Sequence, residues 1–172
     1  MDRDALATAI YDTAHLTGQF VLRSGATSTD YFDKYLFEAD PALLRVIAEH
    51  LAPLVHDDTQ VLAGLELGGV PLAVALGQVM GLPTAFVRKE AKTYGTCKLA
   101  EGGAVADRRV TVVEDVVTSG GQVIASCADL RQQGAQIQGV VCVIDREAGG
   151  SANLAAQELP LTALFVMSDL VP

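Results

Sequence analysis

Residues 110–121 are Val110-Thr111-Val112-Val113-Glu114-Asp115-Val116-Val117-Thr118-Ser119-Gly120-Gly121, and this stretch decides the fold. A strand predicted over 109–113 leads to two adjacent carboxylates, a turn of small and hydroxylated residues, and a helix expected over 121–133. Such a turn directs backbone N–H groups, two hydroxyls and the positive end of the helix dipole toward one point. The stretch therefore predicts a phosphate-binding site between a strand and a helix.

The two carboxylates narrow the class of ligand. Glu114 and Asp115 would repel a bare phosphate, so the ligand should also carry hydroxyls or a cation. A ribose 5-phosphate meets both needs, with its phosphate in the turn over 117–121 and its hydroxyls donating to the two acids. The alternative is an ordinary capped turn beside two helix-proximal acids, because short motifs overpredict.

The pattern on either side of this stretch predicts the fold class. Apolar runs recur at 61–65, 84–88 and 137–144, and each ends in a glycine-rich or charged turn. A helix is expected over 70–80, so strand–helix–strand units repeat along the chain and predict an α/β fold with a central, mostly parallel sheet flanked by helices. Ligands bind beyond the carboxyl ends of the strands in such sheets. The residues directly after each strand are therefore candidate site residues.

The N-terminal third follows a different pattern. We expect a helix over 4–16, a short strand over 19–22 that meets a tight turn, and a second strand over 31–35. Asp40 and Pro41 are typical of a helix start, and this helix should continue to about Pro53. By contrast, residues 89–103 form a long polar stretch without a clear strand or helix, and a loop of that length in a compact domain is usually functional.

Composition excludes several classes of protein. The chain has 172 residues, of which 50% are apolar and 19% charged, which suits one domain with a buried core. The net charge of −9 argues against a nucleic-acid partner. Three cysteines without a CxxC pair favour a reducing compartment, and no apolar run approaches the roughly 18 residues of a membrane span. We therefore expect a cytoplasmic protein with no membrane partner.

The central motif is similar to that of the type I phosphoribosyltransferases, and three further segments resemble the orotate phosphoribosyltransferases among them. Residues 86–95 resemble the RKxxKxxG segment of that family, residues 98–102 the end of its mobile loop, and residues 18–25 with Ser28, Tyr31 and Phe32 its N-terminal hood. The resemblance runs from Gly18 to Arg146. It implies a type I phosphoribosyltransferase fold as a single domain over 1–172, with a small N-terminal hood at about 17–36 and a mobile loop at about 89–103.

The resemblance also implies the activity. Members of the family convert orotate and 5-phosphoribosyl 1-pyrophosphate (PRPP) to orotidine 5'-monophosphate and pyrophosphate in pyrimidine (UMP) biosynthesis, as glycosyltransferases of the pentosyltransferase class. The reaction needs no protein nucleophile and uses Mg²⁺, which we expect to arrive with PRPP instead of binding at a dedicated protein site. The family's mobile loop reaches the neighbouring subunit's site, so a homodimer is implied.

The residue types and the resemblance together predict the site residues. Catalytic roles are expected for Lys92, Lys98, Glu114 and Asp115. PRPP binding is expected at Arg23, Gly68, Gly69, Arg88, Lys89, Lys92, Tyr94, Glu114, Asp115, Val116, Val117, Thr118, Ser119, Gly120, Gly121 and Gln122, and orotate binding at Tyr31, Phe32, Thr118 and Arg146. Many family members have His at Tyr94 and Lys at Arg23; a tyrosine cannot carry positive charge, so a proton-donating role at this position is in doubt.

Several of these residues also admit a structural interpretation. The cations at 88–98 suit the departing pyrophosphate but are also common in a solvated loop. Residues 64–71 look like the family's pyrophosphate loop or a plain glycine turn. Arg146 suits a bidentate bond to the orotate carboxylate or a surface ion pair with Asp145 or Glu147. Tyr31 and Phe32 could cover the base or belong to the core, and redox control through Cys97, which lies among lysines, is a hypothesis.

Two other functions share the predicted pocket. The first is phosphoribosyl transfer to a purine or another base, against which Arg146 and the hood segment argue. The second is a regulator that binds PRPP without catalysis. The acidic net charge and the loop lysines argue against it.

Overall fold

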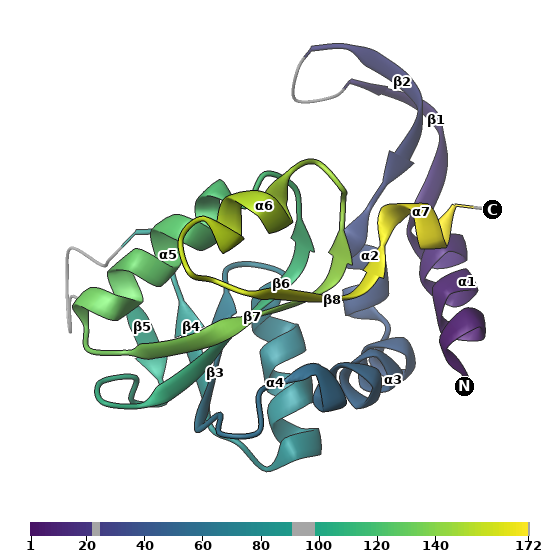
Figure 1. Ribbon diagram of the computed structural model, residues 1–172. Helices are drawn as coiled ribbons and strands as arrows, with labels where there is room; N and C mark the ends of the chain where they lie inside the picture. Colours follow the sequence, from purple (N-terminus) through teal and green to yellow (C-terminus); the bar gives the residue numbers. More distant parts are fainter. Residues whose placement is uncertain (22–24, 91–98, 172) are drawn as a thin grey trace.

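The computed structural model describes residues 1–21, 25–90 and 99–171. Its centre is a six-stranded sheet in the order β5-β4-β3-β6-β7-β8, parallel except for the antiparallel end strand β5 (Figure 1). The strands are β3 (Val61–Leu65), β4 (Thr84–Val87), β5 (Ala100–Gly102), β6 (Arg109–Val117), β7 (Gln136–Asp145) and β8 (Leu161–Val166). The predicted α/β class with a mostly parallel central sheet is confirmed.

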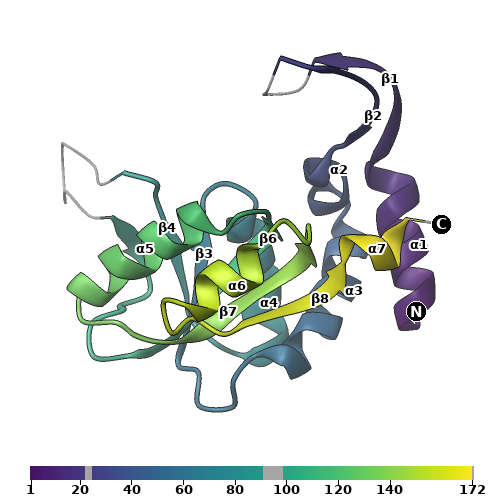
Figure 2. The same cartoon turned by 45° about the horizontal axis from the view of Figure 1, so that its top comes forward.

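Helices cover both faces of this sheet (Figures 1 and 2). One face carries α3 (Pro41–Leu51) and α4 (Gly69–Met80), which pack with α1 (Arg3–Ala14), α2 (Lys34–Ala39) and α7 (Met167–Leu170) into one apolar cluster. The other face carries α5 (Gly121–Gln132) and α6 (Gly150–Ala155), which pack on a second cluster. Between the two clusters β3 is buried along its whole length, and β6 and β7 are buried along most of theirs, as expected for parallel strands covered on both sides.

The N-terminal part departs from the sequence predictions. Helix α1 ends at Ala14, and β1 (His15–Val21) pairs antiparallel with β2 (Thr27–Phe32) in a hairpin that stands away from the body (Figures 1 and 2). The strand predicted over 31–35 is therefore placed too late, because Asp33 accepts a hydrogen bond from the N–H of Tyr35 and starts α2. Helix α3 begins at Pro41 after the Asp40 cap, as predicted, and passes into a short 3-10 turn, η1 (Ala52–Leu54).

The predicted strands and helices of the core are confirmed, with changes at their ends. The largest change is in β6, predicted over 109–113, which continues to Val117 because Val116 and Val117 pair with Ile144 and Asp145 of β7. Glu114 and Asp115 thus lie within the strand instead of following it. Strand β5 lies inside the stretch predicted to lack structure, and the pattern after 146 predicts neither α6, β8 nor α7.

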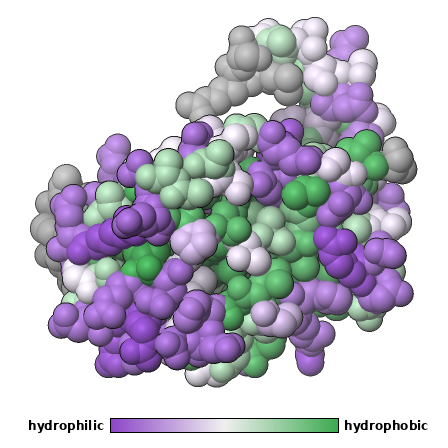
Figure 3. Space-filling view, viewed as in Figure 1, coloured by the Kyte–Doolittle hydropathy of each residue, from purple (hydrophilic) through white to green (hydrophobic). Residues whose placement is uncertain are grey.

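The surface in the view of Figure 3 is mixed, with hydrophobic residues in patches near the middle of the face and hydrophilic residues around them. Within the described ranges, no helix combines the length and apolar character that crossing a bilayer requires.

Candidate active site

Four of the predicted site segments lie at one edge of the sheet. Strands β3, β4, β6 and β7 are parallel neighbours, so the segments that follow them leave from the same side. After β3 the chain crosses to β4 on one side, whereas β6 and β7 lie on the other. The crevice beyond β3 and β6 is therefore the topological switch point, where α/β sheets bind ligands.

The turn after β6 has the features of an anion cradle. Thr118 and Ser119 are exposed, Gly120 has φ 78°, and α5 begins at Gly121. The N-cap residue of α1, α2 and α3 is an aspartate whose carboxylate accepts a backbone N–H, whereas the N-cap residues of α4 and α5 are Gly68 and Gly120, which have no side chain to accept one. The first N–H groups of a helix have no partner inside the helix. Both helix starts at this edge therefore offer donors to an anion.

The loop after β3 approaches the acid pair closely. A Cβ at Gly68 would collide with Oδ2 of Asp115 and lie 2.6 Å from Oε1 of Glu38, and a Cβ at Gly69 would collide with the Val113 carbonyl oxygen. These glycines thus have a packing role in addition to the backbone approach that the sequence predicts for them.

The acid pair is buried and held by hydrogen bonds. Glu114 is 9% exposed and Asp115 exposes no surface. The N–H of Asp115 donates to Oε1 of Glu114 at 3.0 Å, and the N–H of Val116 donates to Oδ1 of Asp115 at 2.5 Å. Nζ of Lys34 lies 2.6 Å from Oδ2 of Asp115. A sugar hydroxyl can reach Asp115 only if the side chains or the loop that cover it move.

Burial and mutual contact separate the proton affinities of these groups. Burial, followed by contact with Asp115, raises the pKa of Glu38 to about 9 and the pKa of Glu114 well above its ordinary value. Burial alone would also raise the pKa of Asp115, but hydrogen bonds with Glu114, Glu38 and Lys34 outweigh it and lower that pKa. Asp115 is therefore the charged member of the cluster at neutral pH.

The segment after β4 is joined to the loop after β3. The N–H of Lys89 donates to Oε1 of Glu66 at 2.6 Å, and the N–H of Arg88 donates to the carbonyl oxygen of Leu99 at 2.9 Å. Nε of Arg88 is buried without a hydrogen-bond partner in the described part of the chain. Buried donors of this kind call for a partner, and a substrate oxygen is one candidate. Arg23, Lys92, Tyr94, Cys97 and Lys98 lie outside the described residues.

The predicted orotate-binding residues lie on two elements. Arg146 follows β7, is exposed, and its N–H donates to the Val117 carbonyl oxygen at 2.8 Å, which joins it to the turn after β6. Its guanidinium forms no ion pair with any residue that the structure describes. Tyr31 is 43% exposed and stacks on Phe20 in the hairpin, whereas Phe32 packs against the core near Phe37. The role of each in orotate binding stays a prediction.

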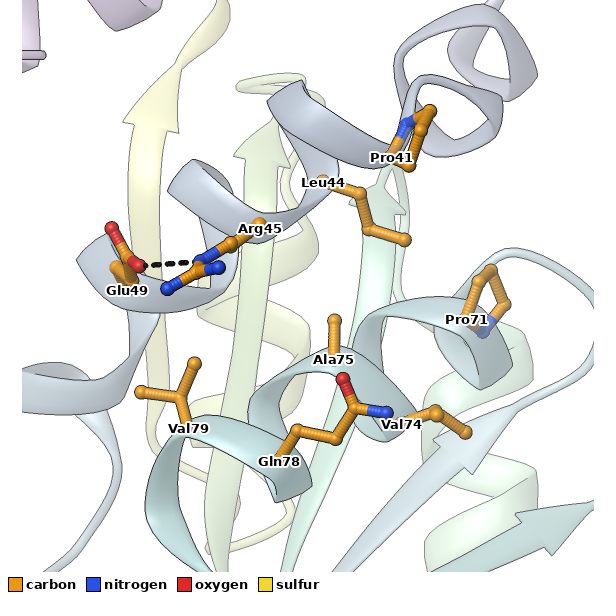
Figure 4. Close-up of a pocket in the computed structure, with 9 residues that line it drawn as sticks. All are labelled: Pro41, Leu44, Arg45, Glu49, Pro71, Val74, Ala75, Gln78 and Val79. Atoms are coloured by element: carbon orange, nitrogen blue, oxygen red, sulfur yellow. Dashed lines mark hydrogen bonds and ion pairs between the residues drawn. The ribbon is translucent and has the colours of Figure 1, made fainter.

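A further cavity lies away from these groups. It is an open groove of about 820 Å³ between α3 and α4, lined by Pro41, Leu44, Arg45, Glu49, Pro71, Val74, Ala75, Gln78 and Val79 (Figure 4). Its cation, Arg45, forms an ion pair with Glu49 at 3.0 Å. The cavity contains no predicted site residue, and its mainly apolar lining does not suit a sugar phosphate. We therefore place the site at the carboxyl ends of the strands and not in this groove.

Direct metal coordination does not suit the acid cluster. The Lys34 ammonium pairs with Oδ2 of Asp115, and the raised pKa of Glu38 and Glu114 favours their neutral forms, which are poor metal ligands. Across the described residues no group of three or more His, Cys, Asp or Glu side chains is arranged to hold a metal ion.

Sequence reasoning missed Lys34 and Glu38. Their spacing of four residues is typical of an exposed ion pair on a helix surface. The structure instead turns both side chains toward Asp115. Only a signal for the short helix α2 and for its position against β6 could have found them.

The sequence matches the phosphoribosyl transferase domain family over residues 37–156. The orotate phosphoribosyltransferase of Nocardioides sp. is 51% identical over 165 residues, which cover 96% of this chain and 92% of that relative. The enzyme of the same name from Methanocella arvoryzae is 42% identical over 154 residues, with 90% and 88% covered. The structure of Mycobacterium tuberculosis orotate phosphoribosyltransferase in complex with PRPP superposes with a TM-score of 0.85 at 28% identity, with 99% of both chains covered.

The likeness to these relatives includes the hairpin as well as the sheet, since the matches extend over nearly the whole chain. The resemblance seen in the sequence is thereby confirmed. The chain belongs to the orotate phosphoribosyltransferase family.

Proposed function

We propose that this enzyme transfers the 5-phosphoribosyl group of PRPP to N1 of orotate, releasing pyrophosphate and orotidine 5'-monophosphate. The observation that carries the proposal is the uncapped start of α5 next to the buried Glu114–Asp115 pair, at the switch point of the sheet. A phosphate next to two acids fits a ribose phosphate better than a bare anion.

Positioning and electrostatics carry the proposed reaction. The 5-phosphate binds the N–H groups and hydroxyls of residues 117–122, and the ribose hydroxyls donate to Glu114 and Asp115. Pyrophosphate lies against the uncapped start of α4 at Gly68 and Gly69, near Arg88 and Lys89. The bond from C1 of the ribose to pyrophosphate breaks as the bond to N1 of orotate forms, and the N1 proton leaves to the pyrophosphate or to solvent. Cations and N–H donors stabilise the charge of the leaving group. Lys92 and Lys98 help to stabilise the same negative charge.

Mg²⁺ belongs to this proposal as a companion of PRPP. When bound with PRPP, it would neutralise negative charge on the pyrophosphate and so favour its departure from the ribose. The protein's acids contact the sugar and not the metal, in accord with the Lys34 contact of Asp115. Turnover should stop with excess EDTA and return when Mg²⁺ is restored, while PRPP-free protein keeps its melting temperature in EDTA. A large fall of that melting temperature would point to a resident metal instead.

The proposed base site uses Arg146. Its guanidinium is exposed at the end of β7 and is joined through its backbone to the phosphate turn. A planar guanidinium suits bidentate recognition of the orotate carboxylate. Tyr31, Phe32 and Thr118 complete this part of the proposal.

The direct test follows the loss of orotate absorbance with PRPP and Mg²⁺. We expect turnover with orotate and little with uracil, adenine or hypoxanthine. Lys92→Ala should lower kcat strongly, and Asp115→Asn should raise KM for PRPP. Turnover with a purine in place of orotate would reassign the acceptor, and PRPP binding without turnover on any base would favour a regulator.

The enzyme acts as a homodimer in this proposal, with the loop over 89–103 serving the partner's site. The support is the resemblance of residues 86–102 to the family's loop. Light scattering gives the oligomeric state, and mixing two defective variants tests the loop. Lys92→Ala mixed with Asp115→Asn should recover about one quarter of the wild-type rate at low PRPP, since half of the dimers are mixed and one of their two sites is complete. No recovery would assign Lys92 to its own subunit.

We place the reaction in the cytoplasm. The described cysteines Cys127 and Cys142 are buried and unpaired, as in a reducing compartment, and burial raises the pKa of Cys127 to about 12. Cell fractionation with an antibody against the chain tests this location.

A further inference from the structure

Helix α2 delivers two charged side chains to the end of β6. Nζ of Lys34 lies 2.6 Å from Oδ2 of Asp115. Glu38, one turn further along, is 7% exposed, and its Oε1 is buried and receives no hydrogen bond from an N–H group of the described part of the chain. The space that a Cβ of Gly68 would fill adjoins both Oε1 of Glu38 and Oδ2 of Asp115. The two carboxyl groups therefore face each other beside the Gly68 backbone.

Three carboxyl groups and one ammonium share this buried space. Glu38, Glu114 and Asp115 cannot all be ionised against Lys34 alone, because burial disfavours each uncompensated charge. A hydroxyl of a sugar needs an acceptor with a free lone pair and a fixed direction. The residues that decide which carboxyl group keeps the charge thus decide which one is the strongest acceptor for a sugar hydroxyl.

We infer that Lys34 and Glu38 are positioning residues that keep the Asp115 carboxylate charged and fixed in direction for a ribose hydroxyl. The inference rests on the proposed function, in which Asp115 binds the ribose of PRPP. Lys34 supplies the countercharge, and Glu38 holds the opposite side of the carboxylate. The Lys34 side chain is 33% exposed, so it is also the part of the cover over Asp115 that reaches solvent and can yield to an incoming sugar.

The proton affinities agree with this geometry. The pKa of Glu38 is raised to about 9, so Glu38 is protonated at neutral pH and can donate to Asp115. The pKa of Lys34 is raised, since contact with Asp115 outweighs the burial that would lower it. The charged or titratable groups that face the cluster are Asp33, Lys34, Tyr35 and Glu38 from α2 and its cap, and Glu114 and Asp115 from β6.

The test measures PRPP affinity by calorimetry with Mg²⁺ present, at about pH 6 and about pH 8. Lys34→Met should bind PRPP about tenfold or more weakly than wild type, because Asp115 then takes up a proton. The ratio of the wild-type affinity to the Lys34→Met affinity should be larger at the lower pH. Lys34→Arg should restore most of the binding. Glu38→Gln keeps a neutral donor and should bind nearly as wild type, whereas Glu38→Leu should not.

The neighbouring helix α3 offers matched controls. Arg45 and Glu49 form an exposed ion pair four residues apart, like Lys34 and Glu38 in spacing but away from the site. Arg45→Met and Glu49→Gln should match wild type at both pH values. If Lys34→Met does not fold, Lys34→Gln takes its place with the same expectation. Equal affinities for Lys34→Met and Arg45→Met at both pH values would overturn the inference, as would equal binding by Glu38→Leu and wild type.

Turnover separates this inference from the proposed function. If wild type converts orotate and PRPP while Lys34→Met binds PRPP normally, the function stands and the inference fails. If wild type binds PRPP with the predicted dependence on Lys34 but transfers it to no base, the inference stands for a PRPP-binding protein and the proposed reaction fails. Loss of PRPP binding by wild type itself removes both.

Discussion

The side-chain amide of Asn153 donates a hydrogen bond of 3.0 Å to the backbone carbonyl oxygen of Ser119. This bond joins α6 to the turn that we assign to the 5-phosphate. A second contact lies beside it, since a Cβ on Gly150 would lie 2.5 Å from the Thr118 carbonyl oxygen. Helix α6 therefore packs against this turn and supports it.

Asn153→Ala should weaken PRPP binding without loss of chemistry. A hydrogen bond of this kind contributes about 1 kcal/mol, so we expect KM for PRPP to rise about fivefold with kcat nearly unchanged. Steady-state kinetics with saturating orotate measure this. Asn153→Asp lacks the donor and should behave like the alanine variant; a normal KM in both would mean that the turn holds its shape without α6.

Gly68→Ala should damage both stability and sugar binding. The new Cβ would collide with the Asp115 carboxylate and approach Glu38 Oε1. Overpacking at such a site costs about 1–3 kcal/mol of unfolding free energy. Denaturant unfolding and PRPP calorimetry check the two effects. As a control for stability, Gly121→Ala has ordinary room, with its Cβ 4.0 Å from Ser119 Oγ, and should not lower the unfolding free energy.

The stability of the enzyme should fall with rising pH in part through Glu38. The pKa of Glu38 is raised from an ordinary value of 4.5 to about 9 by burial and by Asp115. The folded protein thus keeps a proton that the unfolded chain releases, so this contribution is complete below pH 4.5 and is lost as pH approaches 9. Glu38→Gln cannot titrate and should lose less stability between those limits.

Melting curves recorded between pH 4.5 and pH 9 give the slope of stability against pH for wild type and for Glu38→Gln. The pKa of Glu114 is raised in the same direction, so the slope of Glu38→Gln should be reduced and not abolished. Parallel curves for wild type and Glu38→Gln would show that Glu38 titrates normally in the folded protein.

Arg146→Ala should weaken the binding of orotate and leave the affinity for PRPP unchanged. Loss of a charge-assisted bond to a carboxylate costs about 1.5–3 kcal/mol, so KM for orotate should rise about tenfold to a hundredfold. Initial rates over a range of orotate concentrations, with PRPP calorimetry beside them, measure both effects. Arg131→Ala, which removes a guanidinium at the far end of α5, is the control. Equal effects of the two substitutions on orotate would assign the carboxylate to another residue.

The core was predictable because burial on both faces leaves a clear pattern. Strands such as Val61–Leu65 are apolar throughout, and α4 and α5 follow them after glycine turns. The end of β6 was harder to predict, since the charged residues Glu114 and Asp115 suggest that the strand has ended. In the structure the pairing of β6 with β7 continues past them to Val117. Short elements such as α6 and β8, with six residues each, contain too few turns or alternations to give a period.

Tertiary contacts explain what the sequence could not predict about the site. The phosphate turn and the acids are contiguous in the chain, so one motif predicts both. Lys34 and Glu38 lie some 80 residues away from Asp115, and only the packing of α2 against the end of β6 brings them together. No local pattern distinguishes them from a pair on the protein surface.

The central position of β6 separates the sheet, whose residues must stay fixed, from the peripheral residues, which are free to vary. β3 pairs with β6 as far as Val113, and β7 pairs with it past the two acids to Val117, so the acids cannot shift without disrupting the hydrogen bonds to β7. In the proposed function, the choice of nucleobase depends instead on the exposed side chain of Arg146 and on the projecting hairpin of β1 and β2. An engineer seeking a new acceptor should therefore leave the strand intact and redesign the periphery.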